Sequence, residues 1–252
     1  MVHGIDVFTQ HFNHYSNHYV LIGGSACDIL MDELGLTFRA TKDLDIVLII
    51  EAINEDFYLH FLRFITLGGY IRKEVGGLKH QFYRFSHPTN HAYPKQIELF
   101  CRRLENVTLS LHQICTKIPL NDEITSLSAI LLNDDYYELL MKRKREIRNV
   151  SIIDIETLIV FKIRAWLDNK EKKERGEKVT SNDVNKHKND VLRLLVNVSS
   201  SSRVKVNVTI RQEIINFCEL IKNEAIDLRN LELNNVTLDE LLNVLESVYL
   251  DE

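Results

Sequence analysis

The sequence predicts an α/β (α+β) fold, in which a mixed sheet with covering helices is followed by a mostly helical C-terminal domain. Two observations lead to this prediction. Short apolar strands alternate with segments of helical period over the first two-thirds of the 252 residues, and the last third has a helical period almost throughout. With only 9 glycines and 3 prolines the chain contains little linker, so we expect two domains in direct succession, residues 1–120 and 121–252.

The first elements follow from the spacing of apolar residues. Helical spacing of Ile5, Phe8 and Phe12 predicts an N-terminal helix, and the run Leu44 to Ile50 has almost no polar interruption, which suits a strand covered on both faces. In chain order we expect a helix at 5–15, a strand at 19–22, helix 25–33, strand 44–50 and a helix around 57–68.

Glycine and charge mark the later boundaries. The pair Gly76-Gly77 between two apolar runs predicts a hairpin of strands 70–75 and 78–85, and the charged run 142–148 predicts a boundary. The remaining expected elements are strands at 96–100 and near 114–120, a helix at 124–140, and four helices at 155–167, 183–195, 210–222 and 238–250.

Composition and charge restrict the class of protein. The net charge is −5, so no global positive field attracts nucleic acid, and any basic surface must be local. Four scattered cysteines without a Cys-x-x-Cys pair indicate reduced thiols. The chain has no signal-peptide pattern at its start and no apolar run of about 20 residues, so we expect a cytoplasmic protein without a membrane segment.

Gly23-Gly24-Ser25 is the first candidate for a binding site. Two glycines between a strand and a helix let the backbone approach a ligand closely, and the helix start presents N–H groups to an anion. Ser25 adds a hydroxyl at the helix start. These residues therefore fit a phosphate-binding turn, although two glycines before a helix more often form only a tight turn.

Asp43, Asp45 and Glu98 are the candidate metal ligands. The two aspartates are two apart at the start of an apolar strand, so their side chains share one face. Carboxylates there are costly unless they are paired, solvated or bound to metal. Glu98, inside another short apolar strand, would complete a cluster able to hold two metals about 3.5–4 Å apart. The alternatives are that Asp43 caps a loop, Asp45 pairs with a cation and Glu98 faces solvent.

This pattern resembles the DNA polymerase β-like nucleotidyltransferase superfamily. The run from Arg39 through Thr41 and Asp43 to Asp45 is similar to the version found in abortive-infection nucleotidyltransferases of bacterial toxin–antitoxin systems. Residues 18–100 carry most of the resemblance and residues 155–195 a looser one, through Lys162 and the segment 186–191. The third acid is Glu, where Asp is common, and the spacing from Ser25 to Asp43 is longer than in minimal members.

The resemblance implies roles for these residues. Gly23, Gly24 and Ser25 would hold the nucleotide phosphates, whereas Asp43, Asp45 and Glu98 would bind two Mg²⁺ ions and carry catalysis. Arg39 would hold either a carboxylate or phosphate. Lys162, inside an apolar helical stripe, would face the triphosphate, or else snorkel to water or pair with Asp190.

The expected reaction moves a nucleoside monophosphate from a nucleoside triphosphate to a hydroxyl acceptor, RNA (such as tRNA) or protein. The protein would then be a toxin or defence component with a possible cognate antitoxin. The alternative is a catalytically silent nucleotide-binding or antitoxin-type interaction protein of the same fold. The basic run 142–145 is either a solvated helix end or a surface for RNA phosphates, and His11, His14 and His18 are expected on the surface rather than at zinc.

Overall fold

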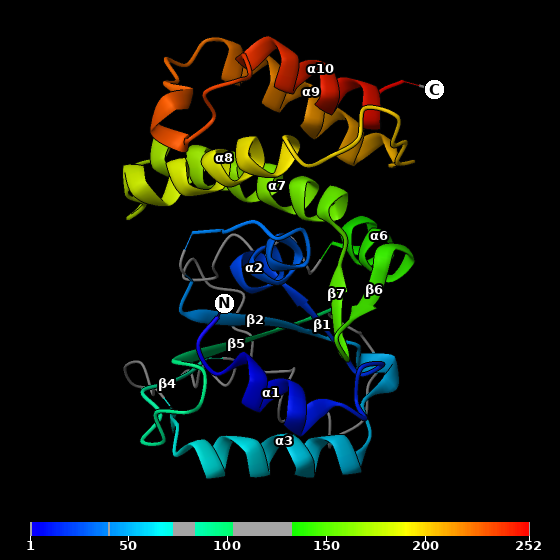
Figure 1. Ribbon diagram of the computed structural model, residues 1–252, viewed down its shortest axis with the longest axis vertical. Coiled ribbons are helices and arrows are strands. Elements are labelled where there is room, and N and C mark those ends of the chain that lie inside the picture. Colours follow the sequence, from blue (N-terminus) through cyan, green and yellow to red (C-terminus); the bar gives the residue numbers. More distant parts are fainter. Residues whose placement is uncertain (1, 40, 73–83, 103–132, 252) are drawn as a thin grey trace. The chain divides into compact units, whose positions relative to one another are not determined.

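The computed structural model describes residues 2–39, 41–72, 84–102 and 133–251. It divides into two compact units, Met1–Asp154 and Ile155–Glu252. The first unit is mixed α/β and the second is helical (Figure 1). The boundary expected at 120/121 falls outside the described residues, and the division observed lies after Asp154.

The described strands of the first unit form one mixed sheet in the order β3-β4-β5-β2-β1-β7-β6. β2 is antiparallel to β1 and parallel to β5, and β1 is parallel to β7. The mixed sheet that the sequence predicts is therefore confirmed. The strands are β1 (Tyr19–Ile22), β2 (Asp43–Leu48), β3 (Ile71–Arg72), β4 (Arg84–Ser86), β5 (Gln96–Cys101), β6 (Lys144–Ile147) and β7 (Val150–Ile153).

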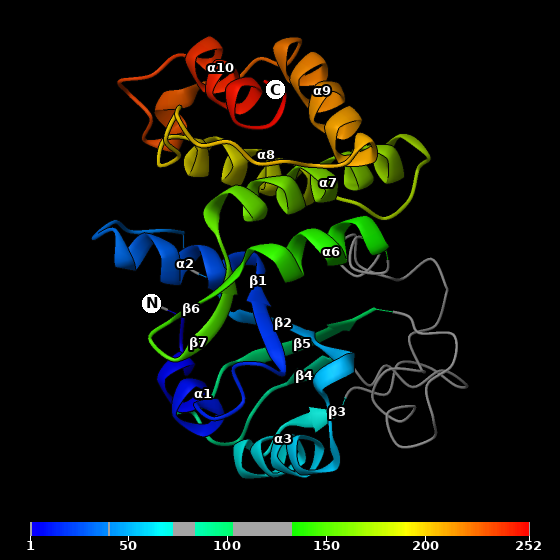
Figure 2. The ribbon, with the colours of Figure 1, turned by 90° about the vertical axis from the view of Figure 1, so that its right-hand side faces the viewer.

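Helices cover both faces of this sheet (Figures 1 and 2). They are α1 (Ile5–Phe12), α2 (Gly23–Glu33), α3 (Glu55–Gly68) and α6 (Asp134–Arg143), with a 3-10 turn at Ile50–Ala52. Ring contacts place α1 and α3 on one face: the Phe8 and Tyr19 centroids lie 5.2 Å apart, and those of Phe61 and Phe85 5.7 Å. α2 lies on the opposite face (Figure 1).

The alternation of side chains along β2 assigns its residues to these two faces. Leu48 is opposite Tyr19 in the register, so Leu48, Ile46 and Leu44 point toward α1 and α3, where they are buried. Asp43 and Asp45 consequently point to the face that carries α2.

The second unit consists of α7 (Ile155–Glu174), α8 (Ser181–Leu195), α9 (Val208–Lys222) and α10 (Leu238–Tyr249), with a 3-10 turn at Leu228–Leu231. All four predicted helices are confirmed. Trp166 of α7 packs edge-on against Phe217 of α9, with ring centroids 5.0 Å apart, in the core. Thr180 begins α8 through a capping box with Asp183, whose pKa is lowered by the Thr180 hydrogen bond. None of the described helices is long and apolar enough to cross a membrane.

Two predictions for the region before this unit are wrong. Residues 142–148, expected as a charged boundary, instead contain the end of α6 and strand β6, which forms a hairpin with β7 in the sheet. A helix continuous over 124–140 is also wrong, because Asn133 has an extended backbone and its side chain caps α6, which begins at Asp134. The turn at Gly76-Gly77 and the strand near 114–120 lie outside the described residues, but β3 and β4 pair antiparallel.

Candidate functional site

The parallel pairing of β2 and β5 brings the three predicted acids to one face of the sheet. Asp45 is opposite Glu98 in the register, and Asp43 is opposite Gln96. Side chains directly opposite on neighbouring strands share a face, and Asp43 and Asp45 share it by their spacing of two. The acids therefore lie on the α2 face, with both aspartates half-buried and Glu98 buried.

Gly23 connects this acid row to the start of α2. Its φ is +65°, a left-handed conformation that other residues rarely adopt. An added Cβ would overlap Oδ2 of Asp45, so glycine is also required by space. The Asp45 carboxylate thus lies directly against the first residue of the helix, where the helix dipole favours negative charge.

Gly24 and Ser25 complete this helix start. A Cβ at Gly24 would come within 2.7 Å of Oγ1 of Thr41, so the loop before β2 lies against the turn. The Ser25 side chain is fully buried, and its hydroxyl donates to the carbonyl of Ile22 at 3.0 Å. The hydroxyl proton of Ser25 is therefore used to hold the strand-to-helix turn. The hydroxyl oxygen can accept a hydrogen bond from a further donor.

Glu98 is held by two neighbours on the same face. Nε of Arg84 lies 2.7 Å from Oε1 of Glu98, and the Gln96 side-chain amide donates to the same oxygen at 2.7 Å. Arg84 is opposite Glu98 in the β4–β5 register. Nothing in the sequence around Arg84 marks it as a site residue, because only the strand register shows that this arginine faces an acid.

The donor set of this face suits magnesium through the two aspartates. Magnesium is commonly bound by one or two carboxylates, with water and substrate phosphate oxygens supplying the other ligands. Asp43 and Asp45 fit that requirement. Over the described ranges no group of three or more His, Cys, Asp or Glu side chains is placed to hold a metal, and Glu98 already contacts Arg84 and Gln96.

Two other predicted site residues, Arg39 and Lys162, do not belong to the row of acids. Arg39 precedes β2, and its guanidinium carbon lies 5.8 Å from the Phe38 ring centroid. Lys162 belongs to the second unit, where its ammonium donates to Oδ2 of Asp190 at 2.9 Å, and both side chains are buried. Within the second unit, Lys162 therefore makes the ion pair with Asp190 that was one of the three expected roles of this lysine.

The basic run 142–145 is largely offset by acids. Lys142 pairs with Glu138, Arg143 with Asp154 and Arg145 with Glu33. A surface whose cations are paired in this way attracts phosphate less than an unbalanced one. The predicted role in RNA binding therefore receives no support from these contacts.

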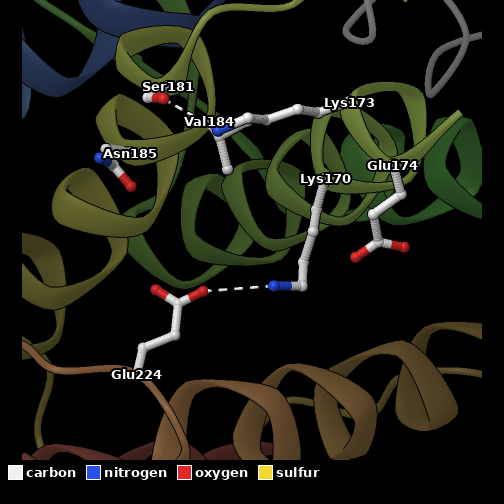
Figure 3. A pocket seen from close by; sticks show the side chains of 7 residues that line it. All are labelled: Lys170, Lys173, Glu174, Ser181, Val184, Asn185 and Glu224. Carbon is white, nitrogen blue, oxygen red and sulfur yellow. Dashed lines mark hydrogen bonds and ion pairs between the residues drawn. The ribbon is translucent and has the colours of Figure 1, made fainter. Parts of the chain in front are cut away.

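A hollow of about 440 Å³ in the second unit contains none of the predicted site residues (Figure 3). Both of its lysines contact other lining residues: Lys170 contacts Glu224 at 3.4 Å, and Lys173 donates to Ser181 at 2.8 Å. Burial raises the pKa of Glu224, but hydrogen bonds and charges from Lys188 and Lys170 outweigh that effect, so the pKa is lowered overall. These polar side chains around the hollow therefore have structural contacts that stabilise the second unit.

Comparison with protein-family models, curated proteins and solved structures found no match for this chain.

Proposed function

We propose that the chain is a metal-dependent nucleotidyltransferase, whose first unit moves a nucleoside monophosphate from a nucleoside triphosphate to a hydroxyl of RNA or protein. The observation that carries the proposal is the position of Asp43 and Asp45 on one face, with the Asp45 carboxylate against the glycine start of α2. A strand, a Gly-Gly helix start and a second strand opening with Asp-x-Asp follow one another there, and a parallel strand adds an acid.

Asp43 and Asp45 would hold Mg²⁺, which when bound supplies positive charge to the phosphates and to the charge that develops in the transition state. The first N–H groups of α2 lack partners inside the helix and are suited to donate hydrogen bonds to phosphate oxygens. Gly23 and Gly24 lack a Cβ, which lets the Asp45 carboxylate and the loop before β2 lie close to that helix start. Arg39 would contact phosphate from the loop before β2. The oxygen of the acceptor hydroxyl would attack the α-phosphorus, and the hydroxyl proton would pass to water. The bond from the α-phosphorus to the bridging oxygen would break, and pyrophosphate would leave with that electron pair.

The enzyme would work in the cytoplasm and modify a tRNA or protein acceptor. It would be a toxin or defence component, with a cognate antitoxin as a possible partner. Among the proposed site residues, Lys162 is left out of this mechanism, because its described contact is with Asp190.

The test uses each α-labelled nucleoside triphosphate with Mg²⁺ and cell extract. We expect labelled RNA or protein from the wild type, and none from Asp43→Asn or Asp45→Asn, because each removes a metal-binding charge. Asp6→Asn, on the exposed side of α1, is the matched control and should label normally. Full labelling by either site variant would contradict the proposal, whereas nucleotide binding without any labelling would support the catalytically silent alternative.

A further inference from the structure

Arg84 is a cation on the acid row that the proposed mechanism does not use. In the strand registers, Asp45, Glu98 and Arg84 lie opposite one another across β2, β5 and β4. The Arg84 side chain is 34% exposed, whereas that of Glu98 is 10% exposed. The carboxylate is therefore the inner partner of this ion pair, and the guanidinium is the partner that reaches solvent.

We infer that Arg84 binds the phosphate chain of the nucleotide and that Glu98 positions Arg84 instead of ligating a metal. This inference rests on the proposed function and adds a phosphate-binding residue to the same face. It replaces the role of third metal ligand that the resemblance implies for Glu98.

The contacts of Glu98 support the positioning role. One oxygen, Oε1, lies 2.7 Å from both Nε of Arg84 and the Gln96 amide nitrogen. A metal at that oxygen would have to displace both groups, and it would leave the guanidinium beside a second cation. Like charges at such a distance repel strongly where water is partly excluded.

The chemistry of the guanidinium supports the phosphate-binding role. Arginine carries five N–H donors in a planar fork, and the contact with Glu98 is made by Nε, so the four N–H groups of the two terminal nitrogens lie outside this contact. A carboxylate that fixes Nε restricts the side chain before the ligand arrives, which lowers the ordering cost of binding. Phosphate oxygens accept forked bonds of this kind.

Charge on the face favours the same assignment. The row contains the carboxylates Asp43, Asp45 and Glu98, and a polyphosphate brings further negative charge. Magnesium on the two aspartates would offset part of it, and Arg84 adds a fixed cation beside Glu98. Gln96 donates its side-chain amide to Glu98 and adds no charge to the row.

The experiment separates metal binding from phosphate binding by two titrations of the full chain. Mn²⁺ alone, followed by its paramagnetic resonance signal, reports the carboxylates, and inorganic tripolyphosphate with Mg²⁺, followed by calorimetry, reports the phosphate contacts. We expect Arg84→Gln and Glu98→Gln to retain the wild-type Mn²⁺ affinity within about twofold. Both should weaken tripolyphosphate binding about tenfold or more, the loss expected for a charge-assisted bond. The double variant should bind it no more weakly than Arg84→Gln.

Arg148→Gln is the matched control, because it removes an arginine that pairs with Asp32 at the other end of the sheet, and it should bind both probes normally. Arg84→Lys retains the charge but loses the fork, and it replaces Arg84→Gln if that variant does not fold; a severalfold loss is then expected. Loss of Mn²⁺ binding in Glu98→Gln, or unchanged tripolyphosphate binding in the Arg84 variants, overturns the inference. A wild type that binds neither probe overturns the proposed function itself.

Discussion

Lys162 of α7 and Asp190 of α8 form a buried ion pair, with Nζ and Oδ2 2.9 Å apart. Only 6% of the lysine side chain and none of the aspartate side chain is exposed. A buried charge is costly unless an opposite charge lies beside it, so each side chain offsets the desolvation cost of the other. The pair therefore joins α7 and α8 through the core of the second unit.

Replacing one partner of this pair should destabilise the second unit strongly. Lys162→Met keeps most of the side-chain volume but leaves the Asp190 carboxylate without the ammonium, which should cost about 3–5 kcal/mol. Denaturant unfolding followed by circular dichroism measures this loss. The double variant Lys162→Met/Asp190→Leu should recover much of it, because two apolar side chains need no partner. A Lys162→Met protein as stable as the wild type would contradict this reading.

Gly23→Ala should reduce both stability and metal binding. The substitution strains a backbone with φ of +65° and places Cβ against the Asp45 carboxylate, so Asp45 must move. Gly35→Ala is the control: its φ is +71°, but no atom lies within 4 Å of the added carbon. The backbone strain should cost about 1–2 kcal/mol in both variants. Weaker Mn²⁺ binding is expected in Gly23→Ala alone, and equal effects in both variants would refute the contact with Asp45.

Gly24 and Thr41 should show strong coupling in a double-mutant cycle. Gly24→Ala brings Cβ within 2.7 Å of Oγ1 of Thr41, which is too close for unstrained packing. Thr41→Ala removes that oxygen, so the double variant should regain part of the stability that Gly24→Ala loses. We expect a coupling energy of about 1 kcal/mol from thermal or denaturant unfolding. Simple additivity of the two substitutions would show that the loop does not lie on the helix start.

Stability of the first unit should fall in mild acid because of His11. Its Nε2 interacts with the His60 carbonyl at 3.3 Å, and Nε2 of His60 interacts with the His11 carbonyl at 2.7 Å. Burial is the main cause that lowers the pKa of His11, with the nearby charges of His60 and Arg63 as smaller causes. The unfolded chain consequently binds this proton more readily than the folded chain.

Below pH about 6.5, the ordinary histidine value, the free energy of unfolding should therefore decrease until the lowered pKa is passed. Denaturant titrations at pH 7.5 and 5.5 measure the difference. His11→Gln keeps an N–H donor and should show a smaller decrease over that interval. An identical pH dependence in His11→Gln and the wild type would exclude His11 as a source of the effect.

The sequence was sufficient to predict the elements that have a strong periodic pattern. The helices of the second unit and the strands that contain Asp45 and Glu98 are found where apolar spacing places them. The common face of Asp43 and Asp45 follows from their spacing alone. These features are local, so a short window of sequence determines them.

Features that depend on distant partners were missed. The β6–β7 hairpin and the residues beside it contain many charged side chains. Three arginines there form ion pairs with acids elsewhere in the fold: Arg143 with Asp154, Arg145 with Glu33, and Arg148 with Asp32. The contact between Arg84 and Glu98 likewise depends on the register of β4 and β5. A linear pattern does not contain strand order or register, so neither interaction could be read from it.

The position of β7 beside β1 has a consequence for synthesis of the chain. Leu21 pairs with Ile152, so the strand that leads into the glycine turn obtains one of its two neighbours from the last part of the unit. Until that part has emerged from the ribosome, β1 has an open edge with unpaired backbone groups, and the closing contact has a large sequence separation. The nascent first unit therefore carries this open β1 edge for most of its translation, and β1 obtains its second neighbour only when β7 is added.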